Sequence, residues 1–291
     1  MTRSPRIALS CAVLAIFLIS ASPVQADDDA EIRALFERFK QAHLDDRLED
    51  VFKSFTQDTK DKFLRYRDFA LYADQDTLTG MLRAHSASEV CLFLWDVHVV
   101  LFLRKAFSEQ ELREFGPKDV FRAVIHSPLA SFFLYDSKYQ WPQERKAIPL
   151  SFEYYFPYQT AVERGIGYVR SSIRRADSDH PLPMNANASL TFFFSKENGV
   201  WAIEAAPILA FANDVFRTVW AMGFVKNASN PDVFKSLIQG SVSAITGKPA
   251  LESDWEPKST AAGTFDPKKC PSNFARTEEL ERLSGQRVFG P

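Results

Sequence analysis

Several common signatures of catalysis are missing from this chain. It contains no Cys-x-x-Cys pair, no Gly-x-Ser-x-Gly stretch and no glycine-rich phosphate loop. These absences argue against thiol-redox chemistry, a cysteine zinc site, a hydrolase nucleophile elbow and a nucleotide-binding loop. The histidines are scattered without ligand spacing, so we expect neither a metal site nor a cofactor.

Cysteine is scarce, with three residues in a chain of 291. Cys11 lies in an apolar N-terminal run, Cys91 lies among apolar neighbours, and Cys270 lies in a segment rich in Pro, Lys and Ser. Export would permit a disulfide between Cys91 and Cys270. Because their surroundings differ so much, we favour two free thiols.

An excess of charge of one sign is also missing. The formal net charge is −2. Residues 1–26 hold two arginines and no acids, so the chain without them has a charge of −4. No basic stripe is present, and we therefore expect no nucleic-acid partner.

The N-terminus has the pattern of a secretory signal. Arg3 and Arg6 precede the 14-residue apolar run IALSCAVLAIFLIS. Val24 and Ala26 then have the spacing of small residues that a signal peptidase recognises. The run is too short for a stable membrane span. We expect a Sec-type signal peptide over residues 1–26, cleavage near Ala26, and a periplasmic or secreted protein.

The order of the hydrophobic patterns predicts an α+β fold. Apolar residues recur at helical spacing from residue 30 to about residue 85. From about residue 131 the chain changes to short segments rich in aromatic and β-branched residues. Asn198-Gly199 separates two of these segments and predicts a tight hairpin. We expect N-terminal helices packed on a strongly curved, cone-like antiparallel sheet, followed by extra C-terminal helices.

We expect a single domain over residues 27–248, with a core at about residues 30–207. Residues 249–291 contain several prolines among Ser, Thr and Lys, and this composition predicts an extended tail.

Residues 90–103, VCLFLWDVHVVLFL, fit two structures. Ser86 and Glu89 form a capping box just before them, which favours a helix. The alternation that begins at Trp95 favours a strand. The length of the run and the cap lead us to prefer a buried helix.

Two stretches give the chain a family resemblance. The helical start LFERFKQAHLDDRLEDVFKSFTQD and the closing hairpin FFFSKENGVWAIE resemble the NTF2-like, or SnoaL-like, superfamily. In that family paired helices lie across a bent sheet, and a Gly and an aromatic residue follow the last turn, as Gly199 and Trp201 do here. The helices after the hairpin give a weaker resemblance to exported phospholipid-shuttling proteins of the lipid-asymmetry pathway.

Asp96 and His98 are the candidate catalytic residues, because both interrupt an apolar run and a buried charge is costly unless paired. In enzymes of the superfamily an Asp or His inside the cone acts as a general acid or base. On a strand both side chains would share a face, whereas on a helix they would lie about 200° apart. A purely structural role for both residues is the alternative.

Phenylalanine is abundant, with 26 residues. The rings predict either a bulky core or a cavity lined by aromatic side chains. The candidate ligand-binding residues are Phe36, Phe39, Phe52, Trp95, Phe192, Phe194 and Trp201.

We expect an exported, non-catalytic protein that binds a lipid or another small hydrophobic molecule. One alternative is a structural envelope protein that binds a protein partner through its tail. The other is a small isomerase or dehydratase that uses Asp96 or His98.

Overall fold

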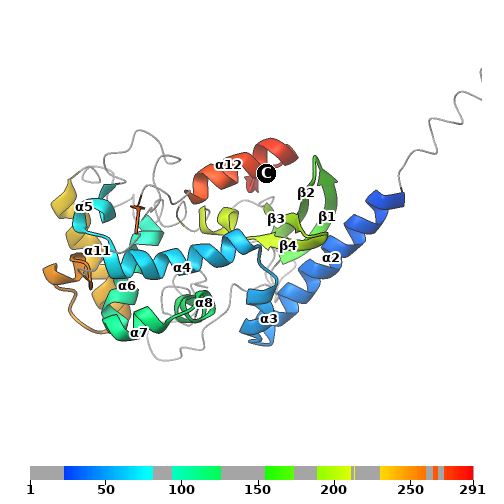
Figure 1. Ribbon diagram of the computed structural model, residues 1–291. Coiled ribbons are helices and arrows are strands. Elements are labelled where there is room, and N and C mark those ends of the chain that lie inside the picture. The colour runs from blue at the N-terminus through cyan, green and yellow to red at the C-terminus, as the bar shows by residue number, and fades with distance from the viewer. Residues whose placement is uncertain are drawn as a thin grey trace, which may run out of the picture.

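The computed structural model shows helices combined with an antiparallel sheet, which confirms the α+β prediction (Figure 1). It describes residues 23–80, 94–125, 155–173, 189–210, 213, 230–259, 265–267 and 272–290. The elements are α2 (Pro23–Leu44), α3 (Leu48–Lys53), α4 (Gln57–Tyr72), α5 (Gln75–Leu78), α6 (Leu94–Ala106), α7 (Glu109–Glu114), α8 (Pro117–Ile125), β1 (Tyr155–Glu163), β2 (Ile166–Ile173), β3 (Ser189–Glu197), β4 (Val200–Glu204), α11 (Pro231–Thr246), the 3-10 helix η4 (Glu252–Trp255), α12 (Asn273–Ser284) and β5 (Phe289–Gly290).

Four strands form an antiparallel meander in the order β1-β2-β3-β4, and β5 pairs with β3. The turns Arg164-Gly165 and Asn198-Gly199 have positive φ at both residues. This geometry matches the twist of the strands that a tight hairpin joins. The second turn confirms the hairpin predicted from Asn198-Gly199.

The sheet is covered by helices on both faces. On one face the ring of Phe36 in α2 lies 5.0 Å from the ring of Phe192 in β3. On the other face Arg276 of α12 donates hydrogen bonds to Ser195 of β3 and Glu204 of β4. Figure 1 shows α2 and α12 on opposite sides of the strands. The N-terminal helices therefore supply one layer, and the C-terminal segment supplies the other.

Burial on both faces explains the three consecutive phenylalanines at 192–194. All residues from Ser189 to Phe194 are buried. Successive side chains of a strand point to opposite faces, so Phe192 and Phe194 face α2 while Phe193 faces the α12 side. A strand buried on both faces has a continuous apolar sequence and no alternation.

The described part of segment 90–103 is helical, because α6 runs from Leu94 to Ala106. Every residue from Trp95 to Leu103 is buried. A helix buried all round has a continuous apolar sequence, so the alternation near Trp95 did not indicate a strand. The expected capping box before this helix lies outside the described residues.

The expectation of an extended tail is wrong for much of residues 249–291. This segment forms η4, α12 and β5, and Trp255 is fully buried. The prolines separate short structured elements, which composition alone could not distinguish from a linker. Cys270, like Cys91, lies outside the described residues.

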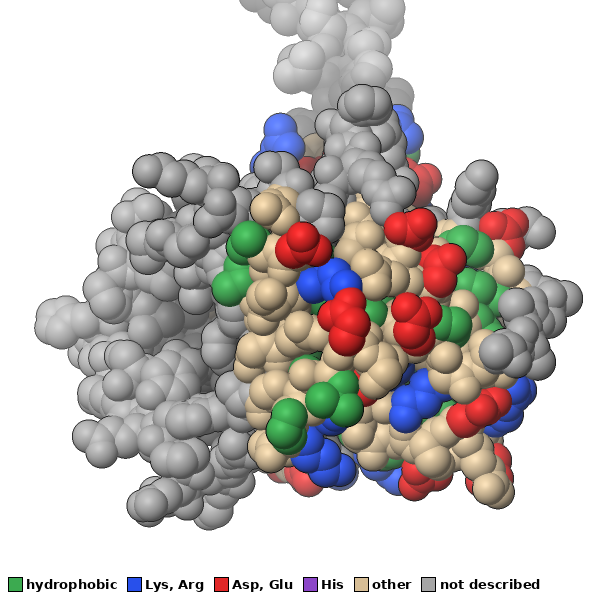
Figure 2. Space-filling view, turned by 90° about the vertical axis from the view of Figure 1, so that its left-hand side faces the viewer, with side chains coloured by type: hydrophobic (Ala, Val, Ile, Leu, Met, Phe, Trp, Pro, Cys, Tyr) green, Lys and Arg blue, Asp and Glu red, His purple; other side chains and the backbone are tan. Residues whose placement is uncertain are grey.

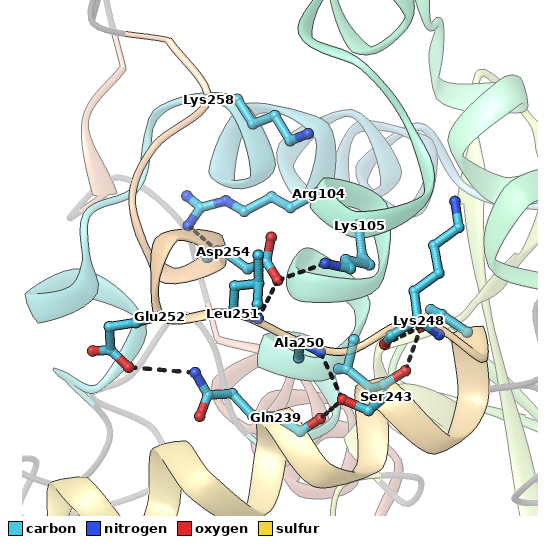
Figure 3. A network of polar contacts seen from close by, with 12 residues as sticks. Arg104, Lys105, Gln239, Ser243, Lys248, Ala250, Leu251, Glu252, Asp254 and Lys258 are labelled. Atoms are coloured by element: carbon cyan, nitrogen blue, oxygen red, sulfur yellow. Dashed lines mark hydrogen bonds and ion pairs between the residues drawn. The ribbon is translucent and has the colours of Figure 1, made fainter.

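Arg104 of α6 fixes the start of this C-terminal segment (Figure 3). Its Nε donates to the carbonyl of Ala70 at 2.8 Å, and one Nη donates to that of Phe69 at 2.9 Å. The other Nη donates to the carbonyls of Trp255 at 2.8 Å and Asp254 at 3.2 Å. One buried guanidinium thus joins carbonyls near the end of α4 to carbonyls in η4, where few helix N–H groups remain to donate.

Acidic, basic and hydrophobic side chains are interspersed on the described surface at the α5–α11 end of the molecule (Figure 2). The large exposed apolar side chains of the described residues include Leu44, Tyr158, Val200 and Leu251. Within the part of the chain that the structure covers, no helix has the length and apolar character needed to cross a membrane.

Gly167 of β2 is required by the close approach of α2. A Cβ at this position would lie 2.4 Å from Cδ1 of the buried Ile32. We predict that Gly167→Ala destabilises the protein by about 1–3 kcal/mol because it overpacks this contact. The exposed Gly240 in α11 has no heavy atom within 4 Å of such a Cβ, so Gly240→Ala should stabilise by about 0.5–1 kcal/mol. Urea unfolding of both variants tests the prediction; equal effects would contradict it.

We predict that Arg104→Leu destabilises the protein by about 3–5 kcal/mol, because it leaves several buried carbonyls without a donor. Limited proteolysis should then cut the C-terminal segment faster than in the wild type. Arg47 is a matched control, since it pairs with Asp45 and Asp50 on the surface, and Arg47→Ala should leave stability and protease resistance close to those of the wild type. Unchanged protease resistance in the Arg104 variant would contradict the role assigned to this side chain.

Candidate functional site

Five buried polar side chains meet between α4, α6 and α12, and we call them the polar cluster. Each of them has less than a tenth of its surface exposed. Buried polar groups are costly unless they are hydrogen-bonded, so their bonds decide what the cluster can do. The members are Lys62 and Tyr66 of α4, Asp96 of α6, Asn213, and Asn273 of α12.

Asp96 is the acceptor at the centre of the polar cluster. One of its oxygens accepts from the Tyr66 hydroxyl at 2.5 Å and from the Asn273 amide at 3.3 Å. The other accepts from the Asn213 amide at 3.1 Å. The Asn213 oxygen in turn accepts from the backbone N–H of Trp95 at 2.7 Å. These bonds hold α4, α6 and α12 together, and they satisfy a carboxylate that would otherwise be costly to bury.

Lys62 is the cation of the polar cluster, and its ammonium donates to the Asn273 oxygen. Only 5% of the residue is exposed. Burial lowers the pKa of Lys62 to about 8, an effect that the carboxylates of Asp58 and Asp96 only partly oppose. A lysine with a pKa this close to neutrality can exchange a proton near physiological pH.

Tyr66 is a proton donor that stays protonated. Its ring is fully enclosed, and burial together with the adjacent Asp96 carboxylate raises the pKa of Tyr66 well above its ordinary value. The phenol therefore donates to Asp96 and does not act as a base at neutral pH.

The two residues predicted as proton carriers are not brought together. Asp96 and His98 are both buried in α6. Residues two apart on a helix lie about 200° apart around its axis. Asp96 therefore belongs to the polar cluster, while His98 faces a different part of the core, and the pair does not form a dyad.

Lys62, Tyr66, Asn213 and Asn273 were not among the predicted site residues. Lys62 and Tyr66 are four residues apart and share the helix face that also carries Phe63. A lysine on the apolar face of an amphipathic helix was the one signal that could have revealed the cluster. The two asparagines carry no such signal, because tertiary contacts alone bring them to Asp96.

Two of the predicted ligand-binding phenylalanines belong to a group of rings between α2, α3, α4 and α8. We call the group the aromatic cluster, and its members are Phe39, Phe52, Phe55, Phe63 and Phe121. The Phe63 and Phe121 rings are 5.1 Å apart, and Phe55 lies 5.6 Å from Phe121. Phe39 lies 5.7 Å from Phe55. These separations are those of packed aromatic pairs.

The remaining predicted ring residues lie elsewhere in the core. Phe36 and Phe192 pack against each other between α2 and β3, and Phe194 is buried nearby on the same strand. Trp201 is buried beside α2, where its indole N–H donates to Asp28 at 3.0 Å. Trp95 is buried at the start of α6. The structure therefore distributes the seven predicted residues over several contacts.

Phe52 is the one predicted ring residue that is only partly buried. It lies 5.6 Å from Phe121, and the ammonium of Lys60 is 5.9 Å from its ring centre. A hollow of about 410 Å³ lies between the start of α3 and α8, and it is lined by Asp46, Arg47, Leu48, Glu49, Asp50 and Arg122. The aromatic cluster thus reaches the surface at the seam between α3 and α8, where basic and acidic side chains are both present.

No protein-family model, curated protein or solved structure matches the chain.

The buried ammonium of Lys62 makes stability depend on pH. Its pKa is about 8 in the folded protein against an ordinary value of 10.5. Between these values the unfolded chain binds more protons, so stability should rise with pH, by on the order of 3 kcal/mol over the whole range. The measurement is the free energy of unfolding from pH 7 to 9.5, where Tyr66 stays protonated.

Lys62→Met should remove this rise. At pH 7 the variant should be more stable than the loss of a buried hydrogen bond alone would predict, because the substitution also removes the cost of burying a charge. The exposed Lys53 serves as the control, and Lys53→Met should retain the rise of the wild type. A wild-type profile that is flat, or that falls between pH 7 and 9.5, would contradict the assignment.

Proposed function

We propose that the protein is exported and binds, without catalysis, a hydrophobic molecule that carries an acyl chain and an anionic head group. The observation that supports this proposal is the aromatic cluster, which extends from the core at Phe39 to the partly buried Phe52. Binding sites for such molecules are mostly apolar and aromatic, with a few polar groups that fix orientation.

The seam between α3 and α8 supplies both kinds of group. The acyl chain would enter beside Phe52 and displace rings that contact one another at 5–6.5 Å. The head group would meet Lys60, which lies above the Phe52 ring, and Arg122, which lines the hollow together with a second arginine and three acids. Charged groups at the mouth of an apolar site give orientation more than affinity.

Membership of the NTF2-like superfamily is part of the proposal. Its support is the order of the elements, with helices first and then an antiparallel meander whose closing hairpin carries Gly199 and Trp201. The signal-peptide pattern of residues 1–26 supports export.

Catalysis at the polar cluster is the weaker alternative. Asp96 accepts from three side chains that also tie helices together, and a general base needs hydrogen-bond reach to a substrate. Partner binding through the tail is also less favoured, because η4 and α12 are bonded to the body by Arg104 and Arg276.

We predict that Phe52→Ala weakens binding of a fluorescent fatty acid about tenfold, which corresponds to about 1.4 kcal/mol. The ring contributes contact area at the entrance, so its removal should lower affinity more than it changes the fold. Fluorescence titration of the purified protein gives the dissociation constants.

Phe107 provides a matched control for this variant. It is also partly buried and lies 4.9 Å from Phe115, in a separate ring group. Phe107→Ala should lose a similar amount of stability and bind like the wild type. Equal loss of binding in both variants would rule out the α3–α8 seam. If the wild type neither binds the probe nor yields a lipid to organic extraction and mass spectrometry, the proposed function is wrong.

A further inference from the structure

The half-buried Asp29, near the start of α2, has a carboxylate oxygen that lacks a donor. Its Oδ1 is buried and has no hydrogen-bond partner among the described residues. Burial and the neighbouring charge of Asp28 raise the pKa of Asp29. Asp28 itself is well paired, since it accepts from Lys196 at 2.7 Å and from Trp201 at 3.0 Å. A buried oxygen without a donor destabilises the fold and calls for an explanation.

The unsatisfied group lies just after the predicted processing site. Helix α2 begins at Pro23, so the N–H groups of residues 27–30 donate to the carbonyls of residues 23–26 within its first turn. A chain that began at Asp27 would have the N–H groups of residues 28–30 free. The nitrogen of Asp27 would become an ammonium two residues from Asp29.

We propose that the Ala26–Asp27 bond is the processing site and that cleavage supplies Asp29 with its missing partners. A membrane-bound signal peptidase adds water across this amide, which leaves a carboxylate on Ala26 and an ammonium on Asp27. The inference rests on the export proposed above.

The new N-terminus would have the charge that a helix start favours. Acidic side chains in the first turn interact favourably with the positive end of the helix dipole and with free N–H groups. Asp27, Asp28 and Asp29 are consecutive, so the shortened helix would begin with three acids. These acids also offset the new ammonium, which alone would be unfavourable at that end of a helix. In the uncut chain the same residues lie one turn further in, where no free N–H is available to Asp29.

The cleavage site must also be exposed before the fold is complete. Proteolysis takes place mainly in exposed, flexible segments, whereas the Ala26–Asp27 bond lies within helix α2. The bonds of Asp28 to Lys196 and Trp201 hold this end of α2 against the β3–β4 hairpin. Cleavage therefore precedes the docking of α2 on the sheet.

The first test is the mass and N-terminal sequence of the exported protein. A chain that begins with Asp27 is expected. Cleavage at another bond would overturn the proposal while leaving export and ligand binding in place. Recovery of the intact chain alone would overturn both the proposal and export, but not ligand binding, which is measured separately.

The second test compares the processed protein with a full-length chain in which Ala26→Leu blocks cleavage, both in the same detergent. Asp29→Asn should lower the melting temperature of the processed protein by roughly 2–4 °C. In the uncut chain it should leave the melting temperature unchanged or raise it, because a carboxylate with an unpaired buried oxygen is removed. Asp28→Asn is the control and should lower the melting temperature of both chains, since the partners of Asp28 are present in both. If Asp29→Asn changed the melting temperature in the same direction in both chains, the proposal would be overturned.

Discussion

The burial of β3 on both faces is the constraint on which the rest of the structure depends. A strand covered on both sides needs two layers of helix, and this chain takes them from its two ends. Helix α2 lies close enough to β2 that Gly167 has no room for a side chain beside Ile32. Helix α12 covers the opposite face and brings Arg276 to Glu204. The C-terminal residues are therefore part of the domain.

Helix α12, which forms the second layer, supplies part of the polar cluster in the core. Helix α12 docks partly through polar side chains, and Asn273 links Lys62 to Asp96. Buried polar contacts of this kind add little net stability compared with apolar packing, but breaking one of them is costly. They fix the position of α12 because each buried polar group needs its hydrogen-bond partner, although the contacts add little net stability. The low pKa of Lys62 is a consequence of this arrangement and does not by itself indicate a catalytic role.

Local patterns in the sequence predicted the local structure well. The Asn198-Gly199 turn and the helical spacing of α2 are properties of short segments. The polar cluster could not be predicted, because Asn213 and Asn273 reach Asp96 from 117 and 177 residues away along the chain. The proline-containing C-terminal segment was mispredicted for the same reason, because distant side chains such as Arg104 and Glu204 bond it to the body.

The abundance of phenylalanine does not by itself imply a cavity. Most of the candidate rings contact one another or the sheet at distances of ordinary packing. Packing of the core therefore explains their presence without a ligand. Phe52 differs because it is partly exposed and has charged neighbours. Phe63 connects it with the polar cluster, since its ring is 6.5 Å from Phe52 and 6.2 Å from Tyr66. A molecule inserted at the α3–α8 seam would therefore shift rings that also support Tyr66, and occupancy of the seam would be coupled to the bonds around Asp96.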